Sequence, residues 1–111
     1  MFADIDRMDA EAWASYLAED AVMRFGNADP VHGRQACRDA LQAFYDMIDG
    51  LSHDMVEQSE QGSATIVESN VTYTRKDGLR VTVPVVTIYR LNDDDLIADY
   101  RVFIDLAPVF E

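Results

Sequence analysis

The side chains best suited to moving a proton are two histidines, because an imidazole titrates near neutral pH. His53 lies in a predicted strand, whereas His32 lies in a predicted loop, where we expect a structural role. Neither has cysteine or carboxylate side chains at metal-ligand spacing, so we predict no metal ion. The one cysteine, Cys37, lies on the apolar stripe of a predicted helix and is expected to pack there as a small hydrophobic residue.

Motifs that bind a cofactor or activate a serine are missing from the sequence. There is no glycine-rich phosphate loop and no Gly-x-Ser-x-Gly turn. We therefore predict no cofactor.

The composition narrows the class of protein. The 111 residues favour a single domain over residues 1–111, and the 21 acidic against 9 basic residues give a formal charge of −12. Such a charge repels nucleic acid and anionic lipid, so we expect neither as a partner. One cysteine excludes an internal disulfide and fits a reducing compartment. No long apolar run or signal peptide is visible, so we expect a cytoplasmic protein.

The first half of the chain predicts helices and the second half predicts strands. Apolar spacing indicates a short helix before Asp9 and a second one after it, which Asp9 can cap. A strand is expected at 21–25, and a longer helix from Arg34 that Gly50 ends. Strands follow at 51–58, 65–74, 79–91 and 96–105, joined by tight turns. Pro84 interrupts one of them, so we expect a bulge or bend there. This order indicates an α+β fold with an antiparallel sheet.

The strand at 79–91 is apolar on both faces. Val83, Val85 and Tyr89 alternate with Val86 and Ile88. A strand buried on both faces needs cover on each side, and the helices can supply only one cover. We therefore predict a homodimer through the sheet, although side chains of the same sheet are an alternative cover.

Three segments, 17–22 (LAEDAV), 30–34 (PVHGR) and 100–105 (YRVFID), carry a resemblance to a known family. With the order of the predicted elements, they make nearly the whole chain resemble the SnoaL-like domains of the nuclear transport factor 2-like superfamily. The resemblance implies a cone-shaped, curved sheet wrapped around the N-terminal helices, with a pocket at the open end of the cone.

The resemblance also implies which side chains face this pocket. Those expected from the helices are Trp13, Leu17, Leu41 and Phe44, and those from the strands are Met23, Phe25, Leu51, His53, Val83, Val85, Thr87, Tyr100, Val102 and Ile104. One hairpin register directs Asn70 inward as well, whereas a three-residue loop at 76–78 directs Ser69 and Tyr73 inward instead. The expected pocket is mostly apolar, as small-molecule sites usually are.

The catalytic groups of related enzymes are largely replaced in this chain. The base of the ketosteroid isomerases would fall at Phe25 and their donor tyrosine at Met1, and the last-strand aspartate of the epoxide hydrolases would fall at Val102. Asp105 matches the acid–base aspartate of the polyketide cyclases, but strand alternation directs it outward unless a bulge rotates it.

These observations favour a domain that binds a small apolar molecule without a complete known catalytic set. The alternative is an isomerase-, cyclase- or dehydratase-type enzyme that uses His53 with Tyr100 or Asp105 as acid–base groups. A purely structural dimerisation domain is a third reading. Asp54, next to His53, should point to the opposite face, so no carboxylate partner for His53 is expected from its own strand. The short first helix predicts a pocket open to solvent.

Overall fold

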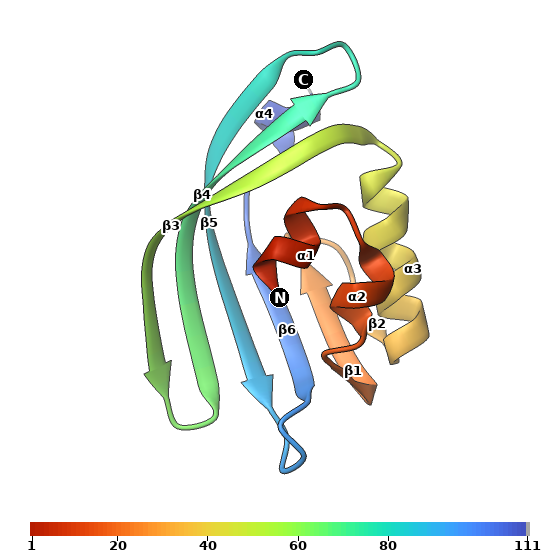
Figure 1. The fold of residues 1–111 in the computed structure, drawn as a ribbon, viewed down its shortest axis with the longest axis vertical. Coiled ribbons are helices and arrows are strands. Elements are labelled where there is room, and N and C mark those ends of the chain that lie inside the picture. Colours follow the sequence, from red (N-terminus) through yellow and green to blue (C-terminus); the bar gives the residue numbers. More distant parts are fainter. Residues whose placement is uncertain (111) are drawn as a thin grey trace.

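The chain forms a six-stranded sheet that curves around its helices (Figure 1). The computed structural model describes residues 1–110. Its strands are β1 (Leu17–Phe25), β2 (Val31–His32), β3 (Ile48–Gln61), β4 (Ala64–Arg75), β5 (Arg80–Leu91) and β6 (Ile97–Phe103). Its helices are α1 (Phe2–Asp6), α2 (Ala10–Ala14), α3 (Arg34–Tyr45) and α4 (Ala107–Phe110).

The sheet has the strand order β2-β1-β6-β5-β4-β3. Its neighbouring strands are antiparallel except for β1 and β6, which run parallel. The α+β fold and the cone-shaped sheet expected from the sequence are confirmed. The parallel pairing of the first long strand with the last one, and the two-residue strand β2, were not predicted.

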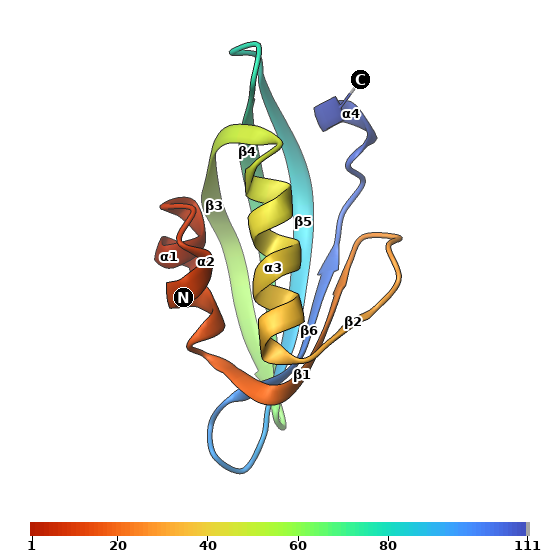
Figure 2. The same cartoon turned by 90° about the vertical axis from the view of Figure 1, so that its right-hand side faces the viewer.

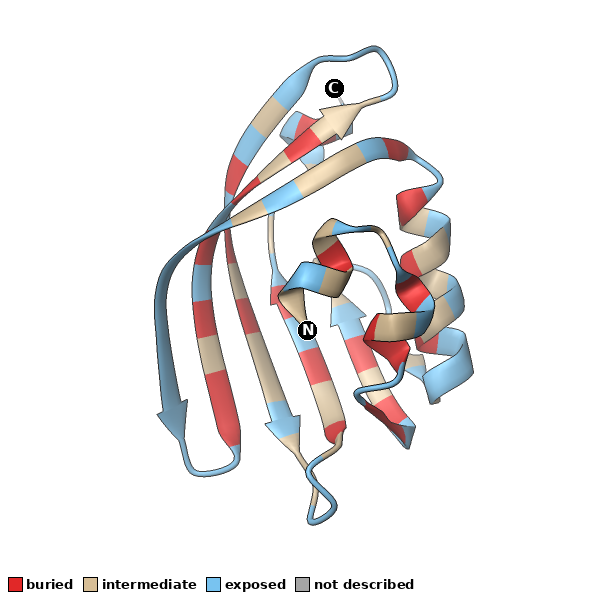
Figure 3. Ribbon diagram, viewed as in Figure 1, coloured by how far each residue is buried: buried red, intermediate tan, exposed pale blue. Residues whose placement is uncertain are grey.

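The helices lie on the concave face of the sheet (Figure 2). Along most of β4, buried residues alternate with intermediate or exposed ones, which Figure 3 shows as red bands between tan and pale blue ones. This alternation is expected when one face of a sheet packs on a core and the other faces solvent. The core therefore lies between the helices and the inner face of the sheet.

Local sequence explains how the helices begin. The Asp9 carboxylate accepts a hydrogen bond from the backbone N–H of Ala12 at 3.0 Å, which confirms it as the N-cap of α2. At the start of α3, Gly33 has a φ of +96°, which a side chain would strain. The guanidinium of Arg34 donates to the carbonyl of Leu17 at 2.9 Å and so ties the start of α3 to β1.

The expectation about Gly50 is wrong. Gly50 does not end α3, because the helix stops at Tyr45 and Gly50 lies within β3, paired with Thr74. Of the bulge or bend expected at Pro84, the bulge is absent, because the β4–β5 register runs unbroken through the pair Asn70 and Pro84. The pairing of β5 with β6 begins only at Val86, so the missing N–H of Pro84 breaks no ladder on that side.

Within residues 1–110, no helix is both long enough and apolar enough to cross a lipid bilayer.

Candidate functional site

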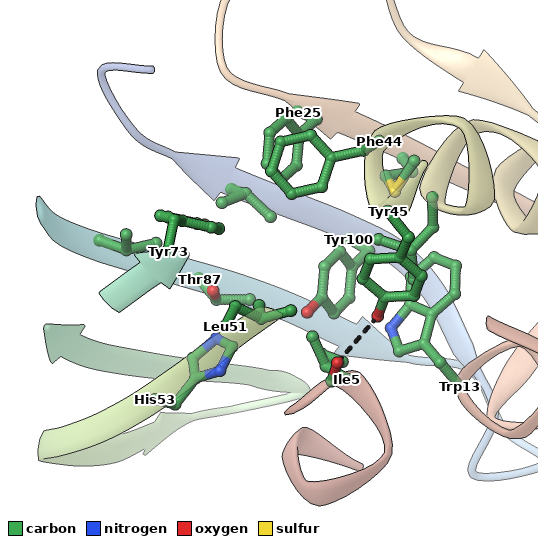
Figure 4. A pocket seen from close by; sticks show the side chains of 14 residues that line it. Ile5, Trp13, Phe25, Phe44, Tyr45, Leu51, His53, Tyr73, Thr87 and Tyr100 are labelled. Atoms are coloured by element: carbon green, nitrogen blue, oxygen red, sulfur yellow. Dashed lines mark hydrogen bonds between the residues drawn. The ribbon is translucent and has the colours of Figure 1, made fainter. Parts of the chain in front are cut away.

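A cavity of about 30 Å³ lies between the concave face of the sheet and helices α1, α2 and α3 (Figure 4). Its lining is mostly aromatic and aliphatic, with few polar side chains. The lining residues are Ile5, Trp13, Met23, Phe25, Leu41, Phe44, Tyr45, Leu51, His53, Tyr73, Val85, Thr87, Tyr100 and Val102. We call this the inner cavity.

Most side chains expected to face a pocket do line the inner cavity. Four others do not. Leu17 and Val83 are buried elsewhere in the core, and Ile104 is half-buried beyond the end of β6. Asn70 is exposed on the outer face of the sheet, because the observed register of β4 directs Tyr73 inward instead. That the lining residues bind a ligand is a prediction.

Three lining residues lie outside the set that the family resemblance places in the pocket. Tyr45 follows Leu41 by one helical turn, so the apolar stripe of α3 could have indicated it. Tyr73 belongs to the alternative hairpin register that the sequence left open. Ile5 reaches the cavity because α1 packs against β3, a contact between distant segments that no local pattern indicates.

His53 is held by the carboxylate of Asp6 at the end of α1. The ring nitrogen Nδ1 lies 2.5 Å from Asp6 Oδ1, and the backbone N–H of His53 donates to Asp6 Oδ2 at 3.1 Å. A carboxylate only accepts hydrogen bonds, so Nδ1 carries the proton, which leaves the lone pair of neutral imidazole on Nε2. As expected, Asp54 on the same strand is not the partner, and the carboxylate comes instead from Asp6 on α1.

Buried tyrosines supply further hydrogen-bonding groups. Burial raises the pKa of Tyr73 above its ordinary value, and it does the same to the pKa of Tyr100, where the Trp13 indole acts in the opposite direction. Both hydroxyls therefore stay protonated at neutral pH and can donate. Burial also raises the pKa of Tyr45, whose hydroxyl donates to the carbonyl of Ile5 at 3.1 Å and so is already engaged.

The indole nitrogen of Trp13 makes no hydrogen bond of ordinary geometry, although it lies near enough to the Tyr100 hydroxyl to lower the pKa of that group. Trp13 is 1% exposed and packs edge-on against Tyr100, with ring centroids 5.3 Å apart. Among the described residues, its Nε1 and the Ser69 hydroxyl are the buried side-chain polar atoms without a hydrogen-bond partner. Figure 4 shows the indole turned toward Tyr45 and Tyr100. Such orphan groups are rare in folded proteins and call for an explanation.

Asp105 does not join this site. It is exposed beyond the end of β6, and its Oδ1 accepts a hydrogen bond from the backbone N–H of Ala107 at 3.0 Å. The carboxylate thus caps the last helical turn and does not line the inner cavity.

Residues near the N-terminus cover part of the inner cavity, although the short first helix predicted a pocket open to solvent. Ile5 closes one side of it, and the Phe2 ring lies 5.1 Å from the His53 ring. In the part of the chain that the structure describes, no three metal-ligating side chains come together.

Replacing Asp6 with alanine should loosen α1 from the sheet. The change removes the acceptor of both His53 N–H groups, so we expect faster exchange of the His53 and α1 amide protons and a loss of about 1–3 kcal/mol in the free energy of unfolding. Hydrogen exchange by NMR and urea denaturation measure these effects. Asp54→Ala, which removes the same charge from the exposed face near His53, is the control. Equal losses in both variants would show that the contact does not hold α1.

Solved structures share this fold at low sequence identity. An NTF2-like protein of unknown function from Burkholderia pseudomallei superposes with a TM-score of 0.88 at 15% identity, covering 99% of this chain and 92% of the other. A protein with a ketosteroid isomerase-like fold from Catenulispora acidiphila, solved with trimethylamine, gives 0.87 at 16%, covering 97% and 84%. An LEH-like epoxide hydrolase from M. tuberculosis gives 0.79 at 17%, covering 98% and 80%.

No curated protein matches the chain. The model of one protein family matches residues 1–100, and this family is described as the SnoaL-like domain. The match spans most of the 111 residues and agrees with a six-stranded sheet that curves around the helices (Figure 1). The chain therefore belongs to the SnoaL-like domain family.

Proposed function

We propose that this domain binds a small, largely apolar molecule whose single polar group, a carbonyl or hydroxyl oxygen, enters the inner cavity. The observation that carries the proposal is the unpaired indole N–H of Trp13, which is 1% exposed in the lining of that cavity. An unpaired buried donor costs about 1–3 kcal/mol, and an oxygen from a ligand removes that cost. The hydroxyl of Tyr100, whose ring packs against the indole, can donate to the same oxygen.

The Trp13 indole gives a direct reporter, because the chain has one tryptophan. In an NMR titration with 2-hexanone, we expect the indole proton to shift downfield as the carbonyl accepts its hydrogen bond. Tyr100→Phe, which keeps the ring and removes a donor, should weaken binding roughly 2- to 10-fold. Tyr16→Phe, at an exposed position, should leave it unchanged. An indole signal unmoved at saturating ketone contradicts the proposal.

Proton transfer is the second candidate, and the contact between Asp6 and His53 favours it. With Nδ1 hydrogen-bonded to Asp6, Nε2 can take a proton from the carbon next to a bound carbonyl. The C–H electron pair then moves toward the carbonyl oxygen, where Trp13 and Tyr100 can stabilise the developing negative charge. Return of the proton from Nε2 to a different carbon of a conjugated enolate completes an isomerisation. Loss of a β-hydroxyl, which takes the proton from Nε2 and leaves as water, completes a dehydration.

Deuterium exchange separates binding from chemistry. If His53 acts as a base, the wild-type protein in D₂O should incorporate deuterium next to the carbonyl of 2-hexanone, followed by NMR. His53→Gln should lower that rate by about 10²- to 10⁴-fold. Asp54→Asn is the control, because it changes an exposed carboxylate beside His53 in the sequence. Binding without wild-type exchange would leave a binding domain and exclude this reaction for that ketone.

The outer face of the sheet supports a second proposal, which is self-association. Its centre is apolar: Val86 and Ile88 are half-buried, and the side chain of Phe103, paired with Val86, is 53% exposed. The helices cover only the opposite face. We name this the outer apolar patch, made of Ile66, Pro84, Val86, Ile88 and Phe103.

Charges on either side of the outer apolar patch differ in sign. Arg24 on β1 and Arg101 on β6 are paired across the strands on one side, and Glu68 on β4 and Glu57 on β3 are paired on the other. A second copy related by a two-fold axis along β5 would bring each basic half against an acidic half. A two-fold interface of this kind uses the same patch on both copies, as most homodimers do.

Charge reversal tests the homodimer. Glu68→Arg and Arg101→Glu should each raise the dissociation constant about tenfold or more, and the double variant should restore association. Sedimentation velocity measures the assembly. Glu60→Arg makes the same change on the inward side of β3, where it pairs with Thr65, and should have little effect. A wild-type protein that is still monomeric at about 100 micromolar contradicts the proposal, because a homodimer with a dissociation constant of about 1 micromolar would be mostly assembled at that concentration.

The cytoplasm remains the compartment that we propose. The single thiol, Cys37, is buried and forms no disulfide. Burial raises its pKa, which keeps it unreactive. This state fits a reducing compartment.

A further inference from the structure

The size of the inner cavity limits what can enter it. Its volume of about 30 Å³ is small beside the roughly 300–1,000 Å³ of most ligand pockets. A carbonyl group needs little room, so it suits this space better than a ring or an alkyl chain does. If the proposed function holds, most of the ligand must therefore lie outside the inner cavity, on a neighbouring apolar surface.

A second pocket of about 180 Å³ lies beside the inner cavity. It is formed by β1, the turn that follows, β2 and one side of α3, and we call it the outer pocket. Its lining is apolar except for one carboxylate, and consists of Met23, Phe25, Ala28, Asp29, Val31, Ala40, Leu41 and Phe44. Small alanines at two of these positions leave the space open.

Four side chains separate the two spaces, because Met23, Phe25, Leu41 and Phe44 line both of them. The rings of Phe25 and Phe44 are in contact, with centroids 5.0 Å apart at an angle of 46°. Both rings are only half-buried. Rotation of a phenyl side chain between rotamers can join the two spaces without moving the backbone.

We infer that the outer pocket holds the alkyl chain of a neutral, straight-chain carbonyl compound whose oxygen lies in the inner cavity. The inference rests on the proposed function and adds the substrate class. An apolar lining suits a hydrocarbon chain, since each buried methylene adds to affinity. The exposed carboxylate of Asp29 at the pocket and the net charge of −12 disfavour an anionic fatty acid.

A series of methyl ketones tests this arrangement. We expect affinity for the intact protein, measured by NMR titration, to rise roughly fourfold per methylene from 2-butanone to 2-octanone. Octanoate should bind at least tenfold more weakly than 2-octanone. Ala40→Leu fills the outer pocket from α3, so it should abolish the rise with chain length while 2-butanone still shifts the Trp13 indole signal.

Ala43→Leu is the matched control, because Ala43 is an exposed residue on the same helix and lines neither space. It should keep the full dependence on chain length. If 2-butanone and the longer ketones all leave the Trp13 indole signal unmoved, the proposed function fails, and the inference fails with it. If 2-butanone binds but affinity does not rise with length, or rises equally in Ala40→Leu, only the inference is overturned. Long ketones that need Ala40 but do not move the indole signal would also overturn it, since the oxygen would then lie elsewhere.

Discussion

The three-residue turn at 76–78 determines the chemistry of the inner cavity, because it fixes the register of β4 against β5. The backbone N–H of Arg75 donates to the carbonyl of Leu79 at 2.8 Å, and Gly78 adopts a φ of +88° that the tight turn requires. In this register Tyr73 faces the helices. A shift of one residue would exchange every inward and outward side chain of β4 and bring Asn70 inward.

The same register organises the opposite face of the sheet. Because Tyr73 points inward, Glu68 points outward, where it pairs with Val86 on β5. The outward position of Glu68 and the inward position of the Tyr73 hydroxyl therefore both depend on one turn. A change of loop length there would alter the cavity and the proposed dimer surface together.

Local patterns predicted much of the fold but little of the site's polar chemistry. The cap at Asp9, the strands of the second half and most cavity-lining side chains follow from spacing and from family resemblance. The contact between Asp6 and His53 joins residues 47 positions apart, and no pattern in either segment indicates it. Gly50 was misassigned because a glycine near a helix end can equally lie within a strand, as it does here in its pair with Thr74.

The charged groups of this site lie nearer to the solvent than its neutral donors do. Phe25 and Val102 are apolar, and both line the inner cavity. A carboxylate deep among these side chains would be costly to ionise. Asp6 instead lies at the end of α1 with its side chain 30% exposed, so it stays solvated while it orients a histidine whose own side chain is 8% exposed. The neutral donors Trp13 and Tyr100 occupy the dry interior, where they can stabilise a ligand oxygen without the cost of burying a charge. Charge near the solvent and neutral donors in the interior form an arrangement suited to a neutral ligand.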